Sequence, residues 1–260
     1  MNTLAGKKIL VTRPRAQAGK MIDLLTAERA TAVVIPVIAT LEVNDEAMAS
    51  RVVGRWLGYD YAMFTSANAV HYFDLWLKGQ NLPWNEALPA WVVGEKTGRA
   101  LTSKNVRRIL SASDAHSAEE LVVSMITGGM RGKKILFPKA RQTRTEPLEK
   151  LLKCGAEVDE LVVYETVKSR DAAAGLRKAL RSSMDWITFF SPSAVKAFFS
   201  IAETPRALSW IKRYDIKIAC VGKVTSSELK RKGLVPLVEC KTPSAEEMIQ
   251  WMNHWEGKMT

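Results

Sequence analysis

The strongest constraint in this sequence is an internal repeat with a period of about 126 residues. The segment Gly6–Leu10 (GKKIL) recurs letter for letter as Gly132–Leu136. Three further blocks follow in the same order at offsets of 125 to 128 residues: residues 60–73 match 185–198, Val93–Thr97 matches Val221–Thr225, and Ser117–Glu120 matches Ser244–Glu247. Four blocks in one order indicate a duplication, so we interpret the chain as two related halves joined near residue 129.

Each half is predicted to alternate short buried strands with helices. The strand candidates are continuous apolar runs, which are typical of parallel sheets covered on both faces: Lys8–Val11, Tyr61–Phe64, Trp91–Val93 and Val106–Leu110, then Lys134–Phe137, Trp186–Phe190, Lys217–Val221 and Val235–Val238. Capping boxes at Ser117-x-x-Glu120 and Ser244-x-x-Glu247 predict helix starts. The fold class is therefore α/β, with two doubly wound parallel-sheet (flavodoxin-like) domains.

Charge and cysteine content narrow the choice of partners and compartment. The chain has 38 Lys and Arg against 27 Asp and Glu, a formal net charge of +11, which leaves nucleic acid, an acidic membrane surface or a polyanionic small molecule open. The basic residues come in short, dispersed groups, which are typical of a solvated surface. Three cysteines without C-x-x-C spacing predict neither a disulfide framework nor a zinc site, and they favour the cytoplasm.

No membrane segment is expected. The longest uncharged apolar run, Ala30–Leu41, falls short of the roughly 20 residues that span a bilayer, and Pro36 interrupts it. The apolar run Ile9–Val11 is too short for a secretory signal, so the sequence from Met1 onward is interpreted as mature protein.

Hydroxyl-rich turns that follow the strands are candidate anion sites. In parallel sheets ligands bind beyond the carboxyl ends of the strands, where helix N-termini offer free N–H groups. Two pairs of turns carry these features: 64–68 with 190–193, and 93–97 with 221–225. Each hydroxyl could equally be a helix cap without a ligand. Neither a P-loop nor G-x-G-x-x-G is present, so nucleotide chemistry is not favoured.

Few other residues have the pattern of a catalytic site. His71, His116 and His254 are isolated, so no metal is expected, and Cys220 is predicted to be a small buried hydrophobe. Tyr164 differs, because it follows the predicted strand Val158–Val163 at its exit. It is either packing or a neutral phenol, with an ordinary pKa near 10, that can donate a proton.

Taken together, these motifs resemble those of uroporphyrinogen-III synthases. The resemblance covers nearly the whole chain and rests on Ile9–Pro14, Phe64–Val70, Val93–Thr97, Val163–Thr166, Phe190–Val195 and Val221–Thr225. It implies a cofactor-independent lyase of haem biosynthesis. Such an enzyme converts hydroxymethylbilane to uroporphyrinogen III, losing water and inverting the terminal pyrrole ring through a spiro intermediate.

The resemblance also implies domains that differ from the sequence halves. It predicts one discontinuous α/β domain from residues 1–38 and 170–260, a second α/β domain from 42–164, and an active-site cleft between them. The two domains would be joined by crossing segments near Ile38–Val43 and Tyr164–Arg170.

Site residues follow from the family motifs. Tyr164 matches the position proposed for the acid that assists loss of water. Substrate-binding positions are predicted at Arg13, Ser66, Asn68, Thr97, Lys139, Ser191, Ser193, Lys223 and Thr225. Arg13 could instead belong to a structural pair. Lys139, Arg141 and Arg144, which follow the strand Ile135–Phe137, could meet substrate carboxylates or could equally be solvated charges. The chain departs from many family members at Ala140, where they have Gly, and from some at Asn68, where they have Arg.

The expected ligand is a single polycarboxylate. Hydroxymethylbilane carries eight carboxylates, which suits helix N-termini and a basic balance. We expect a cytoplasmic monomer without metal, cofactor, nucleic acid or membrane contacts, and a transient contact with the preceding pathway enzyme stays open. The alternatives are a non-catalytic two-lobed anion-binding protein of related fold, which would not need Tyr164, and a nucleic-acid binder, which no recognition motif supports.

Overall fold

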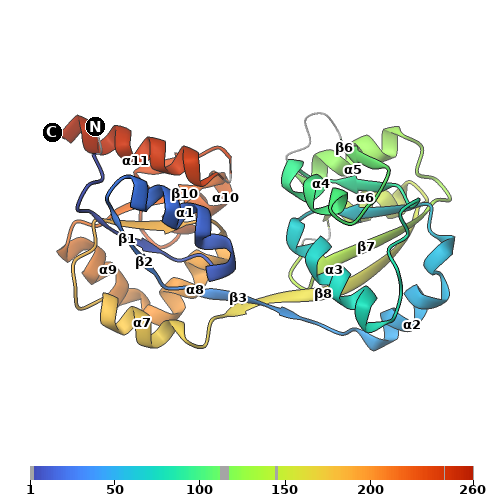
Figure 1. Ribbon diagram of the computed structural model, residues 1–260, viewed down its shortest axis with the longest axis horizontal. Helices are drawn as coiled ribbons and strands as arrows, with labels where there is room; N and C mark the ends of the chain where they lie inside the picture. Colours follow the sequence, from blue (N-terminus) through green and yellow to red (C-terminus); the bar gives the residue numbers. More distant parts are fainter. Residues whose placement is uncertain (1–2, 112–116, 144–145, 243, 260) are drawn as a thin grey trace. The chain divides into compact units, whose positions relative to one another are not determined.

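The computed structural model describes residues 3–111, 117–143, 146–242 and 244–259, and it divides into two compact units (Figure 1). Unit 1 consists of Met1–Ala39 and Val167–Thr260, and unit 2 of Thr40–Thr166. The chain passes between the units twice, within the neighbouring strands β3 (Ile38–Glu42) and β8 (Glu157–Lys168). In the described part of the chain no helix combines the length and apolar character needed to cross a bilayer.

Unit 1 is built on a five-stranded parallel sheet in the order β11-β10-β9-β1-β2. Numbered along the chain, its strands have the spatial order 2-1-3-4-5, with the direction of winding reversing between β1 and β9. The strands are β1 (Lys8–Val11), β2 (Thr31–Val34), β9 (Trp186–Phe189), β10 (Lys217–Val221) and β11 (Val238–Cys240).

Helices cover both faces of this sheet because successive strand residues point to opposite sides. Ile9 and Val11 lie in a core formed with α1 and α11, whereas Leu10 lies in a core formed with the other four helices. These helices are α1 (Arg15–Ala27) and α11 (Ala245–Met259) on one face, and α7 (Ala172–Ala179), α8 (Pro192–Ala202), α9 (Thr204–Arg213) and α10 (Gly222–Lys230) on the other.

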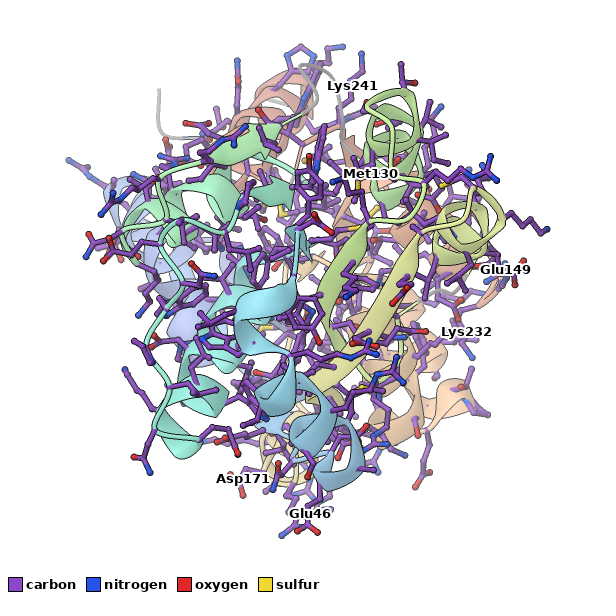
Figure 2. The ribbon with its side chains drawn as sticks, turned by 90° about the vertical axis from the view of Figure 1, so that its right-hand side faces the viewer. Glu46, Met130, Glu149, Asp171, Lys232 and Lys241 are labelled. Atoms are coloured by element: carbon purple, nitrogen blue, oxygen red, sulfur yellow. The ribbon has the colours of Figure 1, made fainter. Side chains whose placement is uncertain are left out.

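Unit 2 contains a six-stranded sheet in the order β3-β8-β7-β4-β5-β6, in which β8 to β6 pair in parallel. Its remaining strands are β4 (Tyr61–Phe64), β5 (Ala90–Val92), β6 (Ile109–Ser111) and β7 (Lys134–Ala140). One face is covered by α2 (Glu46–Gly54), the 3-10 helix η1 (Trp56–Gly58), α3 (Ala67–Gly79) and α4 (Glu95–Thr102), and the other by α5 (Ala118–Thr127) and α6 (Glu146–Lys153). Figure 2 shows this unit from the side, with Glu46 of α2 and Glu149 of α6 at the outer surface.

The two sheets combine strands from both sequence repeats. In unit 1, β1 and β2 of the first repeat pair with β9, β10 and β11 of the second, whereas in unit 2 β7 and β8 of the second repeat pair with β4, β5 and β6 of the first. At the repeat offset, the order β2-β1-β9-β10-β11 corresponds strand for strand to β8-β7-β4-β5-β6. The predicted doubly wound α/β fold is confirmed, and the duplicated halves have exchanged parts to build it.

Two aspartates at equivalent repeat positions, Asp185 and Asp60, link strands that come from different repeats. Asp185 exchanges two hydrogen bonds with the backbone of Lys8, both of 2.8 Å, and lies 3.2 Å from Lys7 Nζ. Asp60 repeats this pattern in unit 2, with two bonds of 2.9 Å to the backbone of Lys134 and 3.1 Å to Lys133 Nζ. The duplicated GKKIL segment thus meets an aspartate of the other repeat in each unit.

Several predicted element boundaries were wrong, and β7 and β8 matter most for the site. β7 runs to Ala140, past the apolar run that ends at Phe137, and β8 runs to Lys168, so Tyr164 lies inside the strand and not at its exit. The strand ends were predicted from apolar runs, which indicate only where side chains are buried. The backbone pairing of β7 with β8 continues beyond the apolar run of β7. In the later strands, β6 begins at Ile109 instead of Val106 and β11 at Val238 instead of Val235.

The predicted caps are present at both helix starts. Ser117 accepts the backbone N–H of Glu120, and Ser244 accepts that of Glu247. The Glu247 carboxylate does not complete the box at Ser244; it accepts the backbone N–H groups of Lys241 and Thr242 instead.

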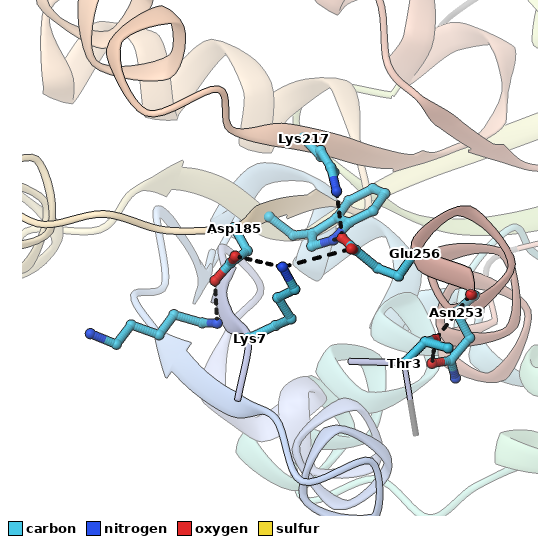
Figure 3. Close-up of polar contacts among 8 residues, drawn as sticks. Thr3, Lys7, Asp185, Lys217, Asn253 and Glu256 are labelled. Atoms are coloured by element: carbon cyan, nitrogen blue, oxygen red, sulfur yellow. Dashed lines mark hydrogen bonds and ion pairs between the residues drawn. The ribbon is translucent and has the colours of Figure 1, made fainter. Parts of the chain in front are cut away.

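A buried carboxylate joins α11 to the amino ends of the unit 1 strands (Figure 3). Glu256 accepts hydrogen bonds from Trp186 Nε1 at 2.8 Å and Lys217 Nζ at 2.7 Å, and its side chain is only 7% exposed. Lys7 lies 3.7 Å away and links this group to Asp185. Burial alone would raise the pKa of Glu256, but these donors and the charges of Lys217 and Lys7 hold it below its ordinary value.

We predict that Glu256→Gln lowers the free energy of unfolding by about 2 kcal/mol at neutral pH, because Lys217 and Lys7 lose their buried counter-charge. A carboxylate with a lowered folded-state pKa stabilises the protein above its unfolded-state pKa of about 4.3, and that stability is lost as the pH falls. The difference between wild type and variant should therefore shrink in acid. Urea unfolding from pH 7 down to about pH 3 measures it, with the exposed Glu239→Gln as the control. Equal values for both variants would contradict the prediction.

Candidate functional site

The predicted site residues gather at the carboxyl edges of the two sheets. In unit 1 the winding reverses between β1 and β9, and in unit 2 between β4 and β7. Ligands of doubly wound sheets bind at such switch points. Arg13 and Ser191 follow β1 and β9, while Ser66 follows β4 and Lys139 lies at the end of β7, so each switch point has a basic and a hydroxyl side chain.

In unit 2 the structure brings Tyr164 and Ser66 together. The Tyr164 hydroxyl lies 3.2 Å from Ser66 Oγ, and either group can donate the hydrogen bond. Ser66 also accepts the backbone N–H of Ala69 at 3.1 Å, which makes it the N-cap of α3. The same serine therefore caps a helix and contacts the phenol, so the interpretation of Ser66 as a helix cap is confirmed.

A β-bulge directs Tyr164 to this position. Lys139 pairs with Val162, but the next residue, Ala140, pairs with Tyr164, so β8 contains one extra residue. As a result Leu161, Val163 and Tyr164 all contribute to the same hydrophobic core. Bulges re-aim side chains and are common beside active sites. Regular alternation would have turned Tyr164 away from Ser66.

The surroundings of Tyr164 keep its phenol uncharged. The residue is only 8% exposed, and its ring stacks on Tyr72 with centroids 5.0 Å apart and planes inclined by 13°. Burial raises the pKa of Tyr164 above its ordinary value of about 10, and this effect outweighs the hydrogen bond from Ser66. The group is thus a proton donor at physiological pH.

Lys139 is held in a buried ion pair. Its side chain is only 8% exposed and its Nζ contacts the carboxylate of Glu160, which projects from β8. The prediction that Lys139 follows the strand was wrong, as was the alternative that it is a solvated charge. Arg141 is exposed and pairs with Glu165 at 3.1 Å, whereas Arg144 lies outside the described residues.

The remaining predicted residues of unit 2 lie in first helical turns. Asn68 is half-buried near the start of α3, and Thr97 is buried in the first turn of α4. Gly94 precedes α4 with φ of +75°, a conformation that side chains other than glycine rarely adopt. The chain can therefore turn from β5 directly into α4.

In unit 1, Arg13 is fixed by its neighbours. Its guanidinium lies 4.3 Å from the ring centroid of Phe190, and its Nε donates to Gln17 Oε1 at 3.3 Å. Burial lowers the pKa of Arg13. The structure thus contains the structural pairing that the sequence left open.

The other predicted residues of unit 1 belong to the starts of α8 and α10. Ser191 caps α8 by accepting the N–H of Ala194 at 3.2 Å, and its Oγ lies 3.0 Å from that of Ser193. Lys223 is exposed in the first turn of α10, and Thr225 is buried behind it. These side chains lie at the edge of the unit 1 sheet and Tyr164 at the edge of the unit 2 sheet.

The described histidines and cysteines offer no metal site. Among the residues that the structure describes, no group of three or more His, Cys, Asp or Glu could hold a metal ion. His71 and His254 are exposed on α3 and α11, and His116 lies outside the described residues. Cys220 is fully buried in β10, as predicted.

Comparison with known proteins decides the family. A family model described as "Uroporphyrinogen-III synthase HemD" matches residues 19–250. The chain belongs to the uroporphyrinogen-III synthase family. It is 26% identical over 238 residues to the uroporphyrinogen-III synthase of Chlorobaculum parvum, covering 88% of this chain and 90% of the relative. It is also 26% identical over 247 residues to the chloroplastic uroporphyrinogen-III synthase of Oryza sativa subsp. japonica, covering 93% and 78%.

Solved structures share the fold. A mutant uroporphyrinogen III synthase from the extremely thermophilic bacterium Thermus thermophilus aligns with a TM-score of 0.68 at 20% identity, covering 97% of this chain and all of the other. The Helicobacter pylori enzyme aligns with a TM-score of 0.63 at 17% identity, covering 96% and 99%. The family resemblance is confirmed, and the chain is a member of a lyase family of haem and tetrapyrrole biosynthesis.

The duplication relates eight of the predicted site residues in pairs. Offsets of 125 to 128 residues pair Arg13 with Lys139, Ser66 with Ser191, Asn68 with Ser193, and Thr97 with Thr225. Tyr164 breaks the pattern, because the position 126 residues earlier is Ile38. The two sheet edges therefore correspond to each other in the repeat, and unit 2 adds a phenol.

Sequence reasoning missed Tyr72, which stacks on Tyr164. The signal was present in the repeat: 125 residues later the matching position is Ala197. A search for repeated motifs does not detect a position at which only one of the two repeats has an aromatic residue.

We predict that Ser66→Ala and Ser191→Ala each cost about 1 kcal/mol of stability, because each removes an N-cap. Only Ser66→Ala also removes the partner of Tyr164. Titration of tyrosine ultraviolet absorbance should therefore show a changed phenol pKa in Ser66→Ala and none in Ser191→Ala. A common titration curve for both variants would show that Ser66 is only a cap.

Proposed function

We propose that this chain cyclises hydroxymethylbilane to uroporphyrinogen III, with loss of water and inversion of the terminal pyrrole ring through a spiro intermediate. Membership of the uroporphyrinogen-III synthase family supports the reaction. The observation that carries the proposal for this chain is the buried, neutral phenol of Tyr164 beside Ser66 at a switch-point edge. A binding protein that only holds an anion does not need such a group.

The first chemical step needs an acid. The terminal hydroxyl leaves as water when the pyrrole nitrogen pushes electrons toward the breaking C–O bond and Tyr164 donates its proton to the leaving oxygen. The phenolate that forms accepts the hydroxyl hydrogen of Ser66, since either partner of that pair can donate. The proton lost from the ring carbon after closure can return to Tyr164, so the reaction releases one water and leaves the enzyme unchanged.

Positioning supplies the rest of the catalysis. Ring closure of a flexible linear substrate is favoured when both ends are held in place, an effect worth about 7 to 11 kcal/mol in well-oriented systems. We propose that carboxylates of the substrate bind Arg13, Ser191, Ser193, Lys223 and Thr225 in unit 1 and Ser66, Asn68, Thr97 and Lys139 in unit 2. For Lys139 this requires that a substrate carboxylate compete with Glu160.

The charge distribution supports a polyanionic substrate. Unit 1 contains 22 Lys and Arg against 11 Asp and Glu, whereas unit 2 contains 16 of each. The whole surplus of +11 therefore belongs to unit 1. Such a field attracts an eight-carboxylate substrate and accelerates its association. Unit 1 is thus suited to capture the substrate, and unit 2 holds the acid.

We infer in addition that the enzyme acts as a monomer in the cytoplasm, with at most a transient contact with the enzyme that supplies hydroxymethylbilane. The free state of Cys154, Cys220 and Cys240 supports a reducing compartment.

We predict that the purified protein, given freshly generated hydroxymethylbilane without metal or cofactor, yields the type III isomer. Tyr164→Phe should fold normally and form that isomer roughly 100-fold more slowly, because general acid catalysis is lost. The isomers are resolved after oxidation to porphyrins, and Tyr61→Phe, in the same unit, is the control. Type I product alone from the wild type would overturn the function, and unchanged turnover of Tyr164→Phe would overturn the role of Tyr164.

A further inference from the structure

The ring of Tyr72, on α3, stacks on the face of the Tyr164 ring. The two rings are nearly parallel, with centroids 5.0 Å apart. Tyr72 belongs to the first half of α3, and the helix cap is Ser66, the group that meets the Tyr164 hydroxyl. One helix therefore supplies both the ring contact and the hydroxyl contact of Tyr164.

Tyr72 is itself anchored at its far end. Its hydroxyl donates to Thr40, with 2.9 Å to the carbonyl oxygen and 2.7 Å to Oγ1. Thr40 lies on β3, the strand that pairs with β8 and hence with the strand of Tyr164. A side chain fixed by its helix at one end and by β3 at the other keeps few rotamers.

The duplication shows that the fold does not require an aromatic residue at this position. At the repeat offsets, Tyr72 corresponds to Ala197 and Tyr164 to Ile38. Ala197 is buried in the core of unit 1, so the equivalent helix α8 packs without an aromatic side chain there. Both tyrosines occur in the same unit, and both are absent from the equivalent positions of the other.

From this geometry we propose that Tyr72 is a positioning residue: its ring fixes the plane of the Tyr164 phenol so that the hydroxyl meets Ser66, and it keeps water from that phenol. The inference rests on the proposed role of Tyr164 as the acid. Tyr72 contacts neither the reacting atoms nor the departing water in this scheme, and it acts through Tyr164.

The stacked pair has charged and titratable groups beside it. His71 lies against Tyr72 with ring centroids 5.0 Å apart. Arg141, just after β7, pairs with Glu165, the residue that follows Tyr164 in β8. Burial is the main reason that the pKa of Tyr164 is raised, and Tyr72 adds to the rise. Without the Tyr72 ring, water would reach the phenol and favour its charged form.

The test compares Tyr72→Leu and Tyr72→Phe with Tyr61→Leu. Tyr61 is also half-buried in unit 2, where its ring lies 6.5 Å from that of Trp91 on the other face of the sheet. We expect Tyr72→Leu to lower kcat about tenfold with little change in KM, Tyr72→Phe to keep the stack and lose only a few-fold, and Tyr61→Leu to keep wild-type kcat. In the Tyr164→Phe background, Tyr72→Leu should cause no further loss, because coupled residues are not additive.

A second measurement does not depend on turnover. Each protein is titrated by ultraviolet absorbance together with its Tyr164→Phe counterpart, and the difference between the two curves gives the pKa of Tyr164. This pKa should fall toward about 10 in Tyr72→Leu and stay unchanged in Tyr61→Leu. If the titration and kcat of Tyr72→Leu match those of Tyr61→Leu, or if its loss of kcat persists without Tyr164, the inference is wrong. If Tyr72→Leu does not fold, Tyr72→Phe decides, since a wild-type kcat there contradicts the anchoring by Thr40.

The titration also separates two kinds of failure. A wild type that produces only the type I isomer would overturn the proposed function, while a downshifted Tyr164 pKa in Tyr72→Leu would still show that Tyr72 controls the phenol. An active wild type with an unshifted Tyr164 in Tyr72→Leu would leave the function intact and overturn the role of Tyr72.

Discussion

The pairing of strands from different repeats is the interaction on which the whole structure depends. In unit 1 the hydroxyl of Thr12, just after β1, donates to the carbonyl oxygen of Thr188 in β9 at 2.7 Å, and Thr188 donates to the carbonyl oxygen of Leu10 at 3.2 Å. Both threonines are fully buried at the centre of the sheet. Buried hydroxyls with good partners are stable there, whereas the same groups without partners would be costly. The aspartates at the amino ends of these strands add a second fastening.

The same pairing also places the predicted site residues. A doubly wound sheet binds ligands where its winding reverses, and in both units that reversal lies between strands of different repeats. Arg13 and Ser191 therefore come from different repeats, and so do Lys139 and Ser66. Once the scaffold had been duplicated, the edges could diverge: unit 1 carries the positive charge, and unit 2 carries the phenol with its stacked tyrosine.

The sequence predicted those parts that depend on local patterns. Apolar runs located the central strands, and the serine turns located the caps of α3 and α8, because a hydroxyl before a helix is needed wherever the first N–H groups must be satisfied. The family was evident from the motifs. The discontinuous division of the chain came from the family resemblance, since the repeat by itself suggested that each half forms its own domain.

The parts that escaped prediction depend on contacts between distant segments. The bulge that turns Tyr164 toward Ser66 is a mismatch in register between β7 and β8, and neither strand has a local sign of it. The sequence predicted a substrate-binding or solvated Lys139 and missed its buried ion pair, because the partner, Glu160, lies on another strand. The stacking of Tyr72 on Tyr164 depends on how α3 packs against the sheet. Such features are properties of pairs of elements, which a single sequence does not specify.

The most direct test of this account is to divide the chain at Gly128–Gly129 and to produce the two sequence halves separately and together. Because each sheet needs strands from both halves, neither half alone should show cooperative unfolding as a monomer, and the two produced together should recover a folded complex with cooperative unfolding. A single half that unfolds cooperatively as a monomer would contradict the account, because the sequence repeats would then be independent folding units.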